Sequence, residues 1–226
     1  MMNILSAPTS LGNRPYESDG TARLTTLGPE KLLQQQIVAR LHASEIGEVA
    51  AADYRDFVRP PGGIRNEDLV LAHVRAIAAA LEPHAGFTLI LGGDCSVLLG
   101  SLLGLSRGRD LGLVYLDGHS DFNIETTSES GGVAGMDLAL ATGRGASDLA
   151  RLRHGRPLVR DEHVVAVGVR DGTFGDASIR SARTAGEVLD HLGDRDFFVH
   201  VDADVLDPAF MPFVDSPTPG GLDPTH

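Results

Sequence analysis

The sequence predicts an α/β protein in which helices cover both faces of a parallel sheet. Strand-like and helix-like segments alternate along the 226 residues, which is the pattern of parallel sheets with crossover helices. Several strand-like segments are continuously apolar, as strands buried on both faces are. Polar and acidic residues follow these segments directly, at the carboxyl ends of the strands, where ligands bind in such folds.

The first half of the chain is predicted to contain two strands and two helices. These are a strand over 3–7, a helix that begins at Pro29 and continues through Leu41, a helix over 67–81 and a strand over 87–91. Proline suits the first position of a helix, where a missing N–H has no cost. Asn66 is expected to cap the second helix, whose buried stripe should include Ala72 and Ala76.

The second half continues the alternation without an internal repeat or a low-complexity segment. The predicted elements are a helix after Ser96 that continues through Leu103, a strand over 113–116, a helix over 136–142, a strand over 164–169, a helix over 184–192 and a strand over 197–201. The length suits one large α/β domain with a substantial core. We therefore expect one domain over residues 1–226.

Composition excludes several classes of partner. The formal net charge of −12 argues against binding to nucleic acid or to an anionic membrane surface. Cys95 is the one cysteine, so no disulfide can form within the chain. No apolar run is long enough for a transmembrane helix. The first residues lack the basic and apolar regions of a signal peptide, so a cytoplasmic location is expected.

Two stretches carry clustered metal-ligand side chains. Asp117, His119 and Asp121 follow one apolar run at alternate positions, and Asp202 and Asp204 follow another. Side chains at a spacing of two share one face of a strand. Clustered carboxylates repel each other and are costly to bury unless a cation lies between them.

The donor types suggest which cations would bind. Carboxylates with one imidazole suit Mn²⁺, Mg²⁺ or Zn²⁺, and two ions that share carboxylates can hold a hydroxide near neutral pH. Either pair of aspartates alone is more often a turn or a helix cap, so the prediction depends on both stretches lying on the same side of one sheet. Cys95 leaves two interpretations open, a small buried hydrophobe or a thiolate ligand that favours Zn²⁺ over Mn²⁺. His200 alternates with Asp202 and Asp204 and could face the same way, but it lies earlier in the strand and is expected to be structural.

Three motifs in this order and spacing resemble the arginase, agmatinase and formiminoglutamase family of ureohydrolases. The motifs are Gly92-Gly93-Asp94-Cys95-Ser96, Asp117-Gly118-His119-Ser120-Asp121 and Val201-Asp202-Ala203-Asp204-Val205-Leu206-Asp207-Pro208. The resemblance spans essentially the whole chain. It implies an arginase-like fold, a three-layer α/β/α sandwich around a parallel sheet. It also implies a homo-oligomer, a trimer or a hexamer.

The resemblance further implies hydrolysis of a guanidino or amidino carbon of a small molecule by a hydroxide that bridges two Mn²⁺ ions per subunit. Asp117 and Asp202 would bridge the ions, Cys95 and Asp121 would complete the first, and His119 and Asp204 the second. Asp121 would also orient the hydroxide as a catalytic residue. Asn123 and Ser130 match residues that bind the substrate.

The chain departs from the family pattern at several positions. Cys95 stands where the family carries His, which opens the site to Zn²⁺ or another divalent metal. Ala134 replaces a proton-transferring His, and Gly132 and Thr173 replace residues that grip arginine. Because the chain ends at His226, we expect it to lack the family's C-terminal segment.

These observations give three hypotheses about function. The leading one is a binuclear-metal hydrolase of carbon–nitrogen bonds other than peptide bonds, with an undetermined substrate. The alternative is a non-catalytic arginase-like protein that keeps the fold and binds metal or ligand; Cys95 and Ala134 favour it, and the retained acidic cluster opposes it. The third is a one-zinc, deacetylase-like hydrolase.

Overall fold

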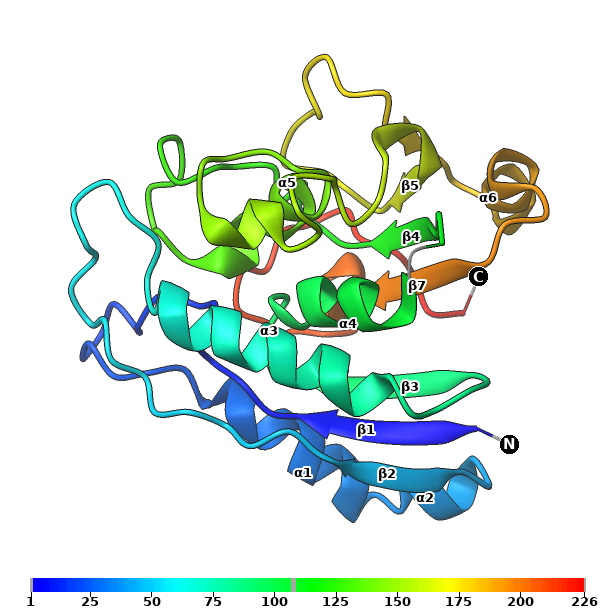
Figure 1. Ribbon diagram of the computed structural model, residues 1–226, viewed down its shortest axis with the longest axis horizontal. Coiled ribbons are helices and arrows are strands. Elements are labelled where there is room, and N and C mark those ends of the chain that lie inside the picture. The colour runs from blue at the N-terminus through cyan, green and yellow to red at the C-terminus, as the bar shows by residue number, and fades with distance from the viewer. Residues whose placement is uncertain (1, 107–108, 226) are drawn as a thin grey trace.

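The computed structural model describes residues 2–106 and 109–225 and contains two parallel sheets (Figure 1). The strands are β1 (Asn3–Ala7), β2 (Ser44–Glu48), β3 (Thr88–Gly92), β4 (Gly112–Leu116), β5 (Val164–Val167), β6 (Arg180–Ser181) and β7 (Phe197–Val201). The strand order is β2-β1-β3 in one sheet and β6-β5-β4-β7 in the other. All neighbouring strands run parallel, as predicted.

Helices lie on both sides of the sheets. The α-helices are α1 (Gly28–Gln34), α2 (Ile37–Arg40), α3 (Glu67–Leu81), α4 (Val97–Ser106), α5 (Asp137–Ala141) and α6 (Ala185–Leu192). The short 3-10 helices are η1 (Leu24–Leu27), η2 (Val133–Gly135), η3 (Asp148–Arg151), η4 (Asp161–His163) and η5 (Ala203–Val205). None of these described helices has the length and apolar character needed to cross a membrane.

Alternating side chains of β4 and β5 divide the structure into three layers. Leu113 and Tyr115 of β4 lie in the core cluster that includes Leu98 and Leu102 of α4. Val114, between them, packs with residues of α6 on the other face. Helix α4 also contributes to the cluster around β1 and α3, so it spans both sheets on one face. Figure 1 shows α3 and α4 in front of the strands.

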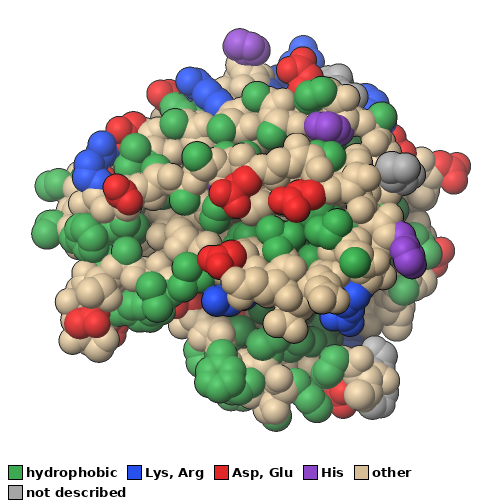
Figure 2. Space-filling view, turned by 90° about the horizontal axis from the view of Figure 1, so that it is seen from below, with side chains coloured by type: hydrophobic (Ala, Val, Ile, Leu, Met, Phe, Trp, Pro, Cys, Tyr) green, Lys and Arg blue, Asp and Glu red, His purple; other side chains and the backbone are tan. Residues whose placement is uncertain are grey.

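Strands β3 and β7 are edge strands that end near each other. Each pairs with one neighbour only among the described residues. On one face of β7, Phe197, Val199 and Val201 remain 43%, 44% and 61% exposed, so this face is not covered by a helix. Figure 2, a view from the β2 side, shows further hydrophobic side chains at the surface and around a hollow in its lower half.

The N-terminal third differs from the prediction in two ways. The helix predicted to continue from Pro29 through Leu41 is divided into α1 and α2, because Gln36 between them has a left-handed φ of 58°. Strand β2 was not predicted. Its side chains are mostly polar and exposed, so it lacks the apolar pattern that marks a buried strand. The exposed, two-residue strand β6 was missed for the same reason.

Two predicted strands are correct in place but not in their ends. Strand β3 begins one residue later than predicted, and Phe87 is 65% exposed. Strand β5 ends at Val167 and not at Val169. Gly168, which follows it, has a φ of 93°, and a Cβ there would lie 3.0 Å from the carbonyl oxygen of Asp117. The remaining predicted elements are confirmed, with ends that differ by up to three residues.

Asn66 lies at the predicted start of helix α3, but it does not cap the helix as predicted. Asn66 precedes the helix, but its φ is 51° and its side chain makes no capping bond. Its Oδ1 instead accepts hydrogen bonds from the backbone of residues 55 and 56. Ala72 and Ala76, predicted to be buried, are exposed. The buried residues are Val70, His73, Val74, Ile77 and Leu81.

Candidate metal centre

The predicted metal ligands gather where β3, β4 and β7 end. Cys95 lies in the loop between β3 and α4, Asp117 directly follows β4, and Asp202 directly follows β7. The Sγ atom of Cys95 lies 2.9 Å from Oδ2 of Asp202 and donates a hydrogen bond to it. The carboxyl ends of the two sheets therefore meet at one place, whereas the sequence predicts a single sheet.

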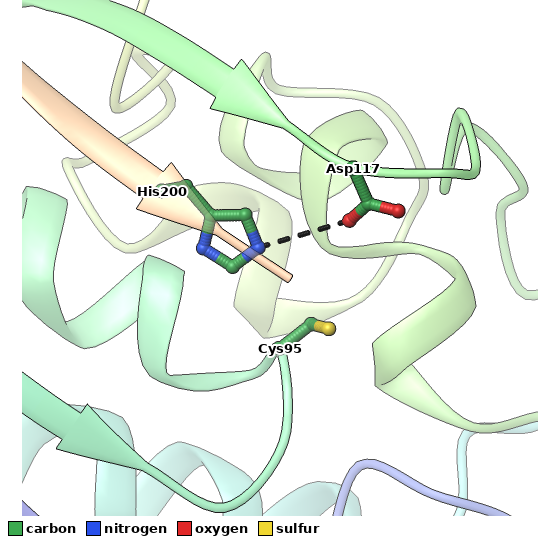
Figure 3. A group of neighbouring side chains, drawn as sticks. All are labelled: Cys95, Asp117 and His200. Atoms are coloured by element: carbon green, nitrogen blue, oxygen red, sulfur yellow. Dashed lines mark ion pairs between the residues drawn. The ribbon is translucent and has the colours of Figure 1, made fainter. Parts of the chain in front are cut away.

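Cys95, Asp117 and His200 form one group of possible metal ligands (Figure 3). One ligand atom from each lies within 4.8 Å of the others. His200 Nε2 and Asp117 Oδ2 are 3.8 Å apart, and neither has a hydrogen-bond partner in the described part of the chain. Asp117 is 1% exposed and His200 6%. His200, expected to be structural, thus points toward the centre of the site.

Asp117, His119 and Asp204 form a second group of possible metal ligands. One ligand atom from each lies within 4.8 Å of the others. His119 Nδ1 lies 2.8 Å from Oδ2 of Asp204 and 3.8 Å from Oδ1 of Asp117. The other nitrogen of the ring, Nε2, lies 3.2 Å from the hydroxyl of Thr218, which orients the imidazole. Asp117 belongs to both groups, so it can bridge two ions.

Local hydrogen bonds explain why these short sequences present their carboxylates together. Asp117 Oδ1 accepts from the backbone N–H of His119, and Asp202 Oδ1 accepts from that of Asp204. The N–H of Gly118 donates to Asp204 Oδ1, which joins the two motifs. The guanidinium of Arg170 donates to the carbonyl oxygens of four residues around the site. These are Gly168, Asp204, Val205 and Thr218.

Asp121 takes part in a hydrogen-bond network that includes a carboxyl group not predicted from the sequence. Asp121 has a left-handed φ of 41°, and its Oδ2 lies 2.8 Å from the hydroxyl of Tyr115. The same hydroxyl lies 3.0 Å from Oδ1 of Asp137. A tyrosine hydroxyl has one proton to donate, so with both contacts made, one of the two carboxyl groups must itself be protonated.

Asp137 is fully buried, and its Oδ2 has no hydrogen-bond partner among the described residues. It is the first residue of α5, and an acidic residue in the first turn of a helix is ordinarily explained by the helix dipole. No signal in the sequence distinguishes it from such a residue. Its place in the network depends on the tertiary contact with Tyr115.

The pKa values show how strongly the site requires positive charge. Burial, followed by repulsion from Asp121, raises the pKa of Asp117 to about 10. Burial also raises the pKa values of Asp121, Asp137 and Cys95. Ionised carboxylates are stable here only with a cation beside them. The unpaired Oδ2 of Asp117 and the mixture of oxygen, nitrogen and sulfur donors fit divalent metal ions.

Asn123 and Ser130, predicted to contact substrate, lie in the loop between Asp121 and η2. Asn123 is exposed and accepts a hydrogen bond from the Thr127 hydroxyl at 3.1 Å. Ser130 accepts one from the N–H of Gly132, also at 3.1 Å. Both remain predictions, because their side-chain contacts are within the loop, and the contact of Ser130 outside it is a hydrogen bond that its backbone oxygen accepts from Arg65.

Comparison with known proteins identifies the family. The family model described as the arginase family matches residues 11–226. The arginase of Bacillus caldovelox is 29% identical over 244 residues, which cover 95% of this chain and 82% of that protein. The arginase of Staphylococcus aureus strain MRSA252 is 28% identical over 255 residues, covering 98% and 80%.

Solved structures also indicate the arginase family. The crystal structure of arginase from Bacillus subtilis superposes with a TM-score of 0.82 at 26% identity and covers 98% of this chain and 81% of that one. The predicted three-layer arginase-like fold is therefore confirmed. The family model extends over nearly the whole sequence, and the chain belongs to the arginase family.

Proposed function

We propose that the protein is a metal-dependent hydrolase of the ureohydrolase type. It would cleave a carbon–nitrogen bond, other than a peptide bond, at the guanidino or amidino carbon of a small molecule. The observation that carries the proposal is the pair of ligand groups that share the buried Asp117. Membership of the arginase family supports the class of reaction. Two divalent ions per chain are the proposed cofactors, with Mn²⁺ the first candidate and Zn²⁺ the second because of Cys95.

Divalent ions bound at these ligands would supply Lewis acidity and lower the pKa of a water molecule. The chain itself supplies the proton-holding groups. Asp121 is oriented by the hydroxyl of Tyr115, which also reaches Asp137. Ala134 cannot transfer a proton, so we assign this role to the carboxyl groups of Asp121 and Asp137.

The charge of the protein favours a cationic substrate. Five acidic residues lie at or beside the metal centre, and the net charge of −12 adds a general attraction for cations. We propose that Asn123 and Ser130 contact the substrate from the loop that follows Asp121. We also propose a homo-oligomer, because exposed apolar side chains such as Phe213, 95% exposed, are suited to contact with another subunit.

The second candidate is a protein that binds metal without catalysis. It is favoured by Ala134, which leaves the position of the family's proton-transferring His without an ionisable group. It is opposed by Asp121 and Asp137, because two further buried carboxyl groups destabilise a fold that has no use for their charge.

Metal content and turnover together test the proposal. The protein is stripped with a chelator, reloaded with Mn²⁺ or Zn²⁺, analysed for bound metal, and incubated with guanidino and amidino compounds. About two ions per chain and release of urea, ammonia or formamide are expected, with both metal binding and turnover lost in Asp117→Asn. Metal uptake without product from any compound supports the non-catalytic candidate, and no metal uptake contradicts the hydrolase.

A further inference from the structure

The ring of His200 is fixed at the metal centre by its contacts. His200 shares a face of β7 with Phe198, which packs against the core cluster that contains α4. The imidazole stacks on the ring of Tyr115, with centroids 4.9 Å apart and an interplanar angle of 11°. Stacking fixes the plane of the ring, and Figure 3 shows its nitrogen directed toward Asp117.

Two buried atoms face each other here without a hydrogen-bond partner in the described residues. They are His200 Nε2 and Asp117 Oδ2, and their separation of 3.8 Å is too long for a hydrogen bond. An unpaired buried polar atom costs about 1–3 kcal/mol. One tetrahedral ion between the atoms would satisfy both, since two of its ligands lie roughly 3.3–3.5 Å apart.

Cys95 adds a third donor of a different kind. Its Sγ lies within 4.8 Å of a ligand atom of His200 and of one of Asp117. A buried free cysteine by itself behaves as a small hydrophobe. Beside the unpaired Nε2 of His200 and the unpaired Oδ2 of Asp117, however, its sulfur completes a set of three convergent donors from β7, the end of β4 and the loop after β3.

We propose that His200 Nε2, Cys95 Sγ and Asp117 Oδ2 bind one Zn²⁺ ion, so that the two metal subsites differ in chemistry. Sulfur and nitrogen donors select Zn²⁺, whereas the group of Asp117, His119 and Asp204, with two carboxylates, suits Mn²⁺ or Mg²⁺. Binding would release the thiol proton of Cys95 to solvent. The fourth position of a tetrahedral site would be taken by a water molecule or by Asp202, whose Oδ2 lies 2.9 Å from Cys95 Sγ. The inference rests on the proposed function only in requiring metal at Asp117.

The test uses the full chain, stripped of metal, and three variants. His200→Phe keeps a ring to stack on Tyr115 and removes the nitrogen, and Cys95→Ser removes the sulfur. His163→Phe is the matched control, because His163 is also buried, at 3% exposed, with an unpaired Nδ1. It lies at the opposite, amino end of β5. Zn²⁺ affinity is measured by competition with a chelator, and Co²⁺ serves as a spectroscopic probe.

The unaltered protein and His163→Phe should bind the first Zn²⁺ equally, and Co²⁺ should give a thiolate charge-transfer band in both. His200→Phe should weaken Zn²⁺ binding at least about tenfold and retain the band, whereas Cys95→Ser should lose it. Unchanged Zn²⁺ affinity in His200→Phe overturns the inference.

A measurement on the unaltered protein keeps the test valid if a variant does not fold. X-ray absorption at the zinc edge should show one sulfur at about 2.3 Å together with imidazole scattering, and a first shell of oxygen alone overturns the inference. This result is independent of turnover. If both subsites fill but no substrate is cleaved, only the proposed function fails.

Discussion

Removing metal should make the stability of the protein fall as the pH rises, and Asp117 determines the size of the effect. Asp117 is 1% exposed, and in the metal-free protein its pKa rises from 3.8 to about 10. Between pH 7 and 9 the folded state therefore keeps this proton, whereas the unfolded state has lost it. Stability falls with rising pH wherever the folded state binds more protons, by about 1.4 kcal/mol per pH unit for one group.

Over these two pH units Asp117 alone should lower the free energy of unfolding by about 3 kcal/mol. For a chain of this size, the corresponding fall in melting temperature is roughly 5–10 °C. Asp121 and Asp137, with pKa values also raised by burial, act in the same direction. The lowered pKa of His200, about 4, has little effect in this window, because the ring is neutral in the folded state and mostly neutral in the unfolded state above its ordinary pKa of 6.5.

The assay is a thermal melt at pH 7, 8 and 9 with and without metal, at constant ionic strength. Bound cations hold Asp117 as a carboxylate in the folded state, so the melting temperature of the loaded protein should change little over this range. Asp117→Asn, which has no proton to lose, should make the metal-free curve less steep, with the remaining slope due to Asp121 and Asp137. Equal pH slopes with and without metal, or a full slope in Asp117→Asn, would refute the reasoning.

Three further predictions concern ligand choice and the loops that support the site. Cys95→His should raise affinity for Mn²⁺ relative to Zn²⁺ at least about tenfold; competition binding measures the ratio, and an unchanged ratio would mean that the sulfur does not set metal preference. Gly93→Ala would place a Cβ 2.1 Å from the backbone oxygen of Thr9. It should lower the free energy of unfolding by about 3 kcal/mol, measured by denaturant titration. Gly135→Ala is the control, because a Cβ there would meet no atom within 4 Å. Arg170→Met removes the donor to four carbonyl groups and should cost about 3 kcal/mol of stability by thermal melting; a loss below half of this would show that water replaces the guanidinium.

The sequence predicts the site as far as strand periodicity extends. Asp117 and Asp202 each follow an apolar strand, and parallel strands bring their carboxyl ends to one edge. The order of the strands was not needed for this prediction. Cys95 could be placed at the edge by the same argument, because a buried strand precedes it. Its hydrogen-bond partner Asp202 lies 107 positions away, and only the family resemblance and the fold bring the two together.

The residues that sequence analysis missed owe their roles to tertiary contacts. His200 was expected to be structural, and its orientation depends on stacking against Tyr115 of the neighbouring strand. Asp137 has the position of an ordinary helix-start acid and joins the site through the same tyrosine. Strand β2 was missed because it is exposed and polar, and its pairing with β1 gives no apolar signal along the chain.

The ligands proposed to bind one ion come from both sheets, so a bound ion would hold the two sheets together. Cys95 is attached to β3 of one sheet, whereas Asp117 and His200 belong to β4 and β7 of the other. No strand pairing joins the sheets in the described residues. An ion held by all three side chains would therefore cross-link the two sheets where β3 and β7 end near each other. Amide hydrogen exchange in β3 and β7 should be slower when the ion is bound, so it would report how much of the protein holds metal.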